Sequence, residues 1–175
     1  MISLIAPKGA LRRTEPGQTP HVTPMELFFD LVYVLTIIQL SHYLLAHLSL
    51  QGALEALVLF AGVWWTWNYT AWAANWVNPN HHAGRLLFVV LMACALLMAI
   101  AIPAAYAERG LLFALAYVSM ALIRAGYMAL LFRGEIMGRN YAQLFCWSAL
   151  SSAFWLAGAL SPEHRLTLWA LAVLV

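Results

Sequence analysis

Three ionisable side chains interrupt segments that are otherwise almost entirely apolar. Glu26 and Asp30 lie one helical turn apart at the start of "TPMELFFDLVYVLTIIQLSHYLLAHL", and Arg124 stands inside "AYVSMALIRAGYMALL". Residues four positions apart share a face of a helix. An arginine inside a membrane is costly unless it is paired or hydrated. We therefore predict that Asp30 pairs with Arg124, while Glu26 serves a helix cap and reaches Arg85 or the headgroup water.

The depth of the two charges in the membrane supports this pairing. At 1.5 Å per helical residue, Asp30 lies about 9 Å and Arg124 about 13 Å from the same side, a difference that an arginine side chain covers. Two interpretations remain open: a structural clip that orders the helices, or a polar relay or counter-ion for a substrate.

Amides and aromatic rings in "GVWWTWNYTAWAANWVNP" accompany these charges. Asn68 and Asn75 fall on one stripe of a helix and can face the level of Asp30 and Arg124. With Glu26 they complete the predicted polar site. The neighbouring tryptophans either pack the bundle or form an aromatic wall around a ligand or ion cavity. The residues of this wall are Trp64, Trp65, Trp67 and Trp72.

A second polar pair is expected toward the other side of the membrane. His42 and Glu55 fall at comparable depths on consecutive helices, so that a hydrogen bond between them is geometrically possible. His42 is then either a satisfied packing group or a proton carrier.

No motif indicates catalysis, a metal or a cofactor. The sequence has no nucleotide-binding loop, "HExxH" motif or Ser/His/Asp order. We predict no catalytic residue and no metal site, and we expect no cofactor. Both cysteines, Cys94 and Cys146, fall in apolar segments without a second ligand nearby, which favours small buried side chains.

Composition indicates the elements that must position these groups. Of 175 residues, 64% are hydrophobic and 9% are charged, and the mean hydropathy is +0.79. Soluble domains contain about 25% charged residues, so that this is a membrane protein. The nine basic residues are too scattered for a nucleic-acid surface. We therefore expect membrane lipids as partners, with a small solute, an ion or a proton as the candidate ligand.

Apolar segments long enough to cross a bilayer predict an all-α bundle of transmembrane helices. Five full spans and part of a sixth fit into residues 23–175, preceded by a polar tail over residues 1–22. Thr23, Pro24 and Glu26 have the spacing of a capping box at the first helix. The predicted spans start near residues 23, 52, 85, 111 and 141, and the partial sixth follows Arg165.

Basic residues outside the spans predict the orientation. Most of them gather on the side of the N-terminus, which predicts a cytoplasmic N-terminus. Because the apolar segment after Arg165 is about half a span long, we expect the chain to be a fragment of a longer protein.

Three stretches together resemble a known family. "TPMELFFDLVYVLTIIQLSH", "WWTWNYTAWAANWVNP" and "FALAYVSMALIR" are similar to the N-terminal part of the bacterial low temperature requirement A (LtrA) family, from about Val22 to at least Arg133. The resemblance implies a longer, polytopic protein of the bacterial inner membrane and carries no molecular activity over. The family-typical positions it implies are Glu26, Phe29, Asp30, Trp64, Trp65, Trp67, Asn75 and Arg124.

Three hypotheses of function follow. The first is a transporter or channel with an inward-facing polar site. The second is a non-catalytic scaffold or sensor whose charge pair only orders the bundle. The third is a lipid-modifying enzyme in which Glu26 or Asp30 acts as a base, although no nucleophile accompanies them.

Overall fold

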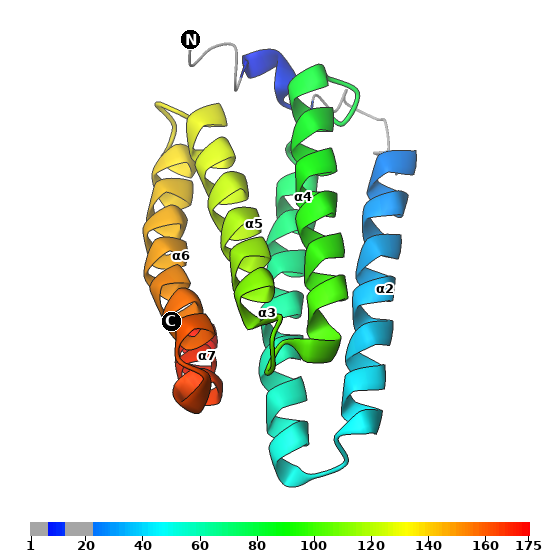
Figure 1. Ribbon diagram of the computed structural model, residues 1–175. Coiled ribbons are helices and arrows are strands. Elements are labelled where there is room, and N and C mark those ends of the chain that lie inside the picture. The colour runs from blue at the N-terminus through cyan, green and yellow to red at the C-terminus, as the bar shows by residue number, and fades with distance from the viewer. Residues whose placement is uncertain (1–6, 13–22) are drawn as a thin grey trace.

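The computed structural model describes residues 7–12 and 23–175, and in these ranges the chain is helical apart from short connections. The long helices run alternately up and down and pack side by side (Figure 1). The prediction of an all-α bundle is confirmed. The predicted tail over residues 1–22 lies outside the described residues except for 7–12. In chain order the elements are η1 (Lys8–Ala10), α2 (Pro24–Ala46), α3 (Leu50–Ala74), α4 (His82–Ala101), η2 (Ile102–Ala104), α5 (Gly110–Leu131), α6 (Ile136–Leu160), η3 (Pro162–His164) and α7 (Arg165–Leu174).

Four helices of the described part are long and apolar enough to cross a membrane: α2, α4 with its η2 extension, α5 and α6. Helix α3 is as long, with 25 residues, but it is not among these four. Its second half carries indole, hydroxyl and amide groups, which lower its hydropathy. A full span at α3 therefore stays a prediction, as does the partial span at α7, which has 10 residues.

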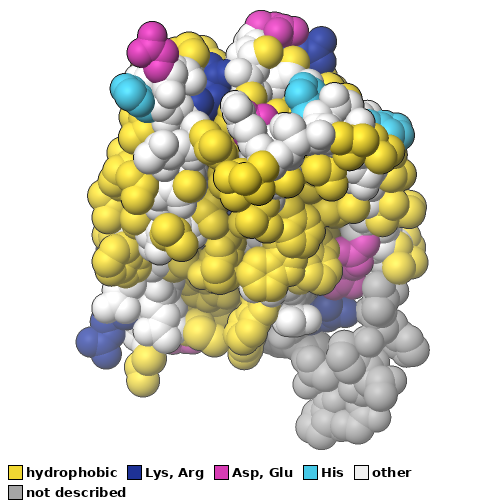
Figure 2. Space-filling model, turned by 90° about the horizontal axis from the view of Figure 1, so that it is seen from below, with side chains coloured by type: hydrophobic (Ala, Val, Ile, Leu, Met, Phe, Trp, Pro, Cys, Tyr) yellow, Lys and Arg dark blue, Asp and Glu magenta, His cyan; other side chains and the backbone are white. Residues whose placement is uncertain are grey.

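The surface of the bundle fits an apolar solvent. Hydrophobic side chains cover most of the face shown in Figure 2, and charged and histidine side chains lie mainly near its margins. Many large apolar residues along α2 and α3 are exposed, including Leu31 and Leu57. In water such a surface would be an association site, whereas a bilayer solvates it.

The start of α2 shows the predicted cap. The Thr23 hydroxyl accepts a hydrogen bond from the Glu26 amide, and the Glu26 carboxylate accepts one from the Thr23 amide at 2.7 Å. The expected contact of Glu26 with Arg85 is wrong, because Arg12 Nη1 forms an ion pair with Glu26 Oε1 at 2.7 Å. Arg12 is held there by its own backbone, since its amide donates to the carbonyl of Trp76.

Helix α5 is the most enclosed of the long helices and packs against α3, α4 and α6. Beside it, aromatic rings from several elements form a continuous column. The ring centroids of Tyr117 and Trp155 are 4.5 Å apart, those of Trp155 and Trp169 5.1 Å, and those of Trp169 and Tyr106 5.1 Å. Gly62 of α3 allows this packing, because a Cβ there would come within 3.0 Å of the Trp155 ring.

Arg165, the first residue of α7, ties two helix ends together. Its guanidinium donates to the carbonyls of Gly158 and Ala159 in the last turn of α6 and to those of Ala105 and Ala107 after η2. Arg165 is itself buried. Its charge is therefore used to satisfy carbonyl groups that the helices leave without partners.

Because Glu26 supplies both a cap and an ion pair, Glu26→Ala should destabilise the protein. We expect the free energy of unfolding to fall by about 1–2 kcal/mol, which should appear as a lower midpoint of thermal unfolding in detergent.

Glu135→Ala is the matched control. Glu135 also lies at a helix start at this end of the bundle, directly before α6, but its side chain is exposed and forms no cap. An equal loss in both variants would contradict this account of the Glu26 contacts.

Candidate functional site

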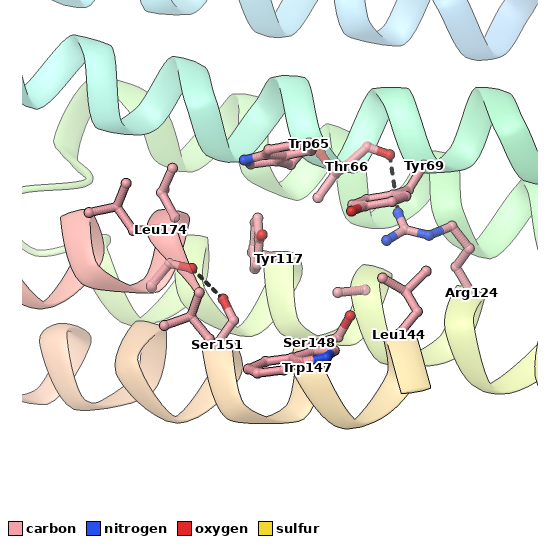
Figure 3. Close-up of a pocket in the computed structure, with 14 residues that line it drawn as sticks. Trp65, Thr66, Tyr69, Tyr117, Arg124, Leu144, Trp147, Ser148, Ser151 and Leu174 are labelled. Carbon is pink, nitrogen blue, oxygen red and sulfur yellow. Dashed lines mark hydrogen bonds between the residues drawn. The ribbon is translucent and has the colours of Figure 1, made fainter. Parts of the chain in front are cut away.

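A cavity of about 230 Å³ lies among α3, α5, α6 and α7 and contains the buried arginine (Figure 3). One side is aromatic, with Trp65 and Tyr69 stacked at 5.5 Å between ring centroids. The opposite side carries the hydroxyl groups of Ser148 and Ser151, and the rim is exposed at Trp147. Its lining residues are Trp65, Thr66, Tyr69, Tyr117, Ala121, Arg124, Leu144, Trp147, Ser148, Ser151 and residues 172–175.

Arg124 reaches this cavity from α5 and is 2% exposed. Its Nη1 donates to the carbonyl oxygen of Thr66 and to Thr70 Oγ1, each at 3.1 Å. Its guanidinium carbon lies 5.3 Å from the centroid of the Tyr69 ring. A guanidinium has five N–H donors, and both of these bonds come from one nitrogen.

The positive charge of Arg124 has no acidic partner among the described residues. Within that part of the chain the salt bridge is the one between Arg12 and Glu26. Arg124 Nε is buried and has no hydrogen-bond partner within residues 7–12 and 23–175. In Figure 3 the guanidinium extends toward Thr66 and Tyr69, beside the open space of the cavity. The arrangement can therefore accept an anionic group, with aromatic rings and hydroxyls around it.

The predicted pairing of Asp30 with Arg124 is wrong. Asp30 is exposed, and its Oδ1 accepts a hydrogen bond from Trp67 Nε1 at 3.0 Å. The buried face of α2 passes through Phe29 and Tyr33, so that Asp30 is turned away from it toward the outside of the bundle. Equal depth in the membrane did not bring the two charges onto facing sides of their helices.

The structure divides the predicted polar site between two places. Glu26, Asp30 and Asn75 line a separate cavity of about 290 Å³ at the N-terminal end of α2, together with Arg12. Asn68 is half-buried and lines neither this cavity nor that of Arg124. Arg124 thus stands apart from the acids and amides that were expected beside it.

The predicted aromatic wall is also divided. Trp65 faces the Arg124 cavity, whereas Trp64 and Trp67 lie on the outside of the bundle and line a groove with Asp30. Trp72 is exposed. Three of the four tryptophans therefore face away from the arginine.

The expected bond between His42 and Glu55 is wrong as well. His42 is exposed, while Glu55 is buried and accepts a hydrogen bond from the hydroxyl of Tyr43 at 2.5 Å. Tyr43 lies on the buried face of α2, and His42 lies beside that face.

Cys94 is buried as expected, whereas the expectation of a buried side chain is wrong for Cys146, which is exposed on α6. The described residues contain no cluster of three or more His, Cys, Asp or Glu side chains that could hold a metal ion.

Several residues of the cavity were not identified from the sequence, although their helical spacing places them on the faces that line it. Tyr117 and Ala121 lie seven and three residues before Arg124, on the same face of α5. On α6, Leu144, Ser148 and Ser151 repeat at intervals of four and three. A search along the face of the arginine, instead of for acids at its depth, would have found them.

Comparison with known proteins gives a family and one relative. The family model described as "Bacterial low temperature requirement A protein (LtrA)" matches residues 21–175. An uncharacterized protein of Rhizobium meliloti (strain 1021) is 39% identical over 168 residues, which cover 94% of this chain and 41% of the relative. The chain therefore spans about two fifths of the length of this relative. No solved structure matches.

The contacts of Arg124 predict an effect of Thr70→Val, which keeps the shape of the side chain and removes its hydroxyl. Arg124 would lose one of its two hydrogen bonds, and we expect a loss of about 1–3 kcal/mol in the free energy of unfolding, measured by denaturation in detergent.

Thr36→Val is the matched control, because the buried Thr36 hydroxyl bonds only to its own helix at Val32. If the two variants were equally stable, the bond from Arg124 to Thr70 would contribute nothing measurable.

Proposed function

The chain belongs to the bacterial low temperature requirement A family, and from the surroundings of Arg124 we propose that it forms part of a membrane transporter that binds a small organic anion at this residue. The observation that carries this proposal is a buried guanidinium without an acidic partner in the described chain, at the edge of a cavity. Burial of an unpaired charge costs several kcal/mol, a cost that an anionic ligand would offset.

The walls of the cavity suggest the shape of the anion. Trp65 and Tyr69 offer flat ring surfaces, and Ser148 offers a hydroxyl group on the opposite side. The hydroxyl of Ser151 donates to the carbonyl of Ala172 at 2.6 Å. A planar carboxylate with an apolar ring would complement both features. A single aromatic carboxylate such as benzoate is therefore a suitable first probe.

The proposed location is the inner membrane, with the N-terminus in the cytoplasm. Arg12, Arg85, Arg133 and Arg139 are near the end of the bundle where α2 begins, and Arg109 and Arg165 are near the other end. In membrane proteins the cytoplasmic side usually carries the larger number of basic residues.

A scaffold without transport is the second candidate, and one observation favours it. Both hydrogen bonds of Arg124 connect α5 to α3, which is what a clip between two helices would do. In that case the cavity would hold lipid or water, and the charge would act only through packing.

The test measures uptake of labelled benzoate by the full-length protein in proteoliposomes. Arg124→Gln removes the charge, and we expect it to lower uptake roughly 10- to 100-fold, because a charge-assisted hydrogen bond is lost. Arg133→Gln is the matched control, since Arg133 is exposed in the connection after α5. Uncharged benzamide should neither compete with benzoate nor be retained.

Equal benzoate uptake by the native protein and a folded Arg124→Gln variant would contradict the anion site. If the native protein moved neither benzoate nor other small carboxylates, and Arg124→Gln changed only the thermal stability, the scaffold would be the better explanation.

A further inference from the structure

A second cavity, of about 380 Å³, lies at the opposite end of the bundle from the start of α2. It is formed by the last turn of α2, the first turns of α3 and the connection between η2 and α5. Its lining residues are Tyr43, His47, Ser49, Gln51, Gly52, Glu55, Pro103, Ala104, Tyr106 and Ala107. None of them lines the cavity of Arg124.

Glu55 is the charged group of this cavity, and it is 8% exposed. Its Oε2 accepts the short bond from the Tyr43 hydroxyl at 2.5 Å, and its Oε1 accepts one from Gln51 Nε2 at 3.0 Å. A hydroxyl bond of this length is typical of a carboxylate acceptor. Neutral donors therefore orient the carboxylate without balancing its charge.

The basic groups nearby are engaged elsewhere. Arg165 donates to four backbone carbonyls, and Arg109 Nη1 donates to the carbonyl of Ile100 at 2.9 Å. His47 bonds through Nδ1 to the carbonyl of Tyr43 at 2.9 Å, and its ring stacks on Tyr43 with centroids 4.3 Å apart. No salt bridge to Glu55 occurs in residues 7–12 and 23–175.

We propose that this cavity binds an ammonium group, with the carboxylate of Glu55 as its counter-charge. The volume of the cavity exceeds what a bare metal ion would fill, and the lining contains aromatic and aliphatic surface beside the carboxylate. Carboxylate oxygens and tyrosine rings are the groups that recognise organic ammonium ions. This inference does not depend on the anion site at Arg124.

Tyr106 is suited to help hold such a group. Its ring lies 6.3 Å from that of Tyr43, and its hydroxyl donates a hydrogen bond to the carbonyl oxygen of Glu55 at 3.5 Å. Burial, and after it the charge of Glu55, raises the pKa of Tyr106. The hydroxyl therefore stays neutral, and the face of the Tyr106 ring is available to an ammonium ion.

The ammonium group could belong to a soluble amine or to a lipid headgroup, since the cavity lies at one end of the membrane-length helices. The chemistry recognised is the same for both sources. Ethanolamine is a suitable probe, because it is a free amine and also the headgroup of phosphatidylethanolamine.

The experiment titrates ethanolamine hydrochloride into the full-length protein in phosphatidylglycerol nanodiscs and follows binding by calorimetry and by the thermal midpoint. Sodium chloride at the same ionic strength is the reference. We expect saturable binding of ethanolamine and at least about tenfold weaker binding in Glu55→Gln. Glu108→Gln, an exposed acid at the same end, should bind as the native protein does.

Gln51→Lys tests the site without burying a new group. Gln51 is exposed and already bonds Glu55 one turn away, so that a lysine there supplies a tethered ammonium to the carboxylate. The variant should fold with at least native stability and lose ethanolamine binding. Native affinity in Gln51→Lys, or an equal response to sodium chloride, would overturn the proposal.

Nanodiscs that also contain phosphatidylethanolamine separate the two sources. A weaker apparent affinity for added ethanolamine in these discs supports the site with the lipid headgroup as its ligand. An unchanged affinity supports the site with a soluble amine as its ligand.

Discussion

Arg124 is buried without a carboxylate partner in the described chain, and the helices around it must therefore supply other acceptors for its N–H groups. A guanidinium in an apolar interior needs acceptors, and here it obtains a backbone carbonyl and a hydroxyl from one turn of α3. These bonds join α5 to α3 at the level of the cavity. The Tyr69 ring faces the same charge and reduces its exposure to apolar surroundings. The cavity therefore exists beside a charge that the described chain solvates only in part.

The helices could be predicted from the sequence because their signals are local. Apolar length and the capping box at Thr23 indicated where helices begin, and both hydrogen bonds of the predicted cap are present. The start of α6 was predicted five residues too late, at Tyr141 instead of Ile136, because polar residues in its first turns resemble a connection. Helix α3 was predicted as a full span near residue 52. It has 25 residues, but with its polar second half it is not among the four helices apolar enough to cross a membrane.

The partners of the charged side chains could not be predicted. The sequence indicates how deep a residue lies in the membrane more readily than which side of its helix faces the neighbouring helix. Asp30 and His42 both failed for one reason: each lies next to the buried face of α2 that contains Phe29 and Tyr43. A shift of one residue rotates a side chain by about 100° around a helix. Tyr43 thus contacts Glu55 where His42 was expected. The bond of Arg124 to the carbonyl of Thr66 could not be predicted from residue types, because every residue has a backbone carbonyl.

Arg165 has an electrostatic consequence for its end of the bundle. The carboxyl end of a helix carries a partial negative charge of about half an elementary unit, because its last carbonyl dipoles are aligned and unpaired. The Arg165 guanidinium contacts two such ends, that of α6 and that following η2, so that their dipoles together compensate about one positive charge. These dipoles reduce the field of the cation where it stands. Although Glu55 lies at the same end, Arg165 is therefore occupied by carbonyl dipoles and forms no ion pair with that carboxylate.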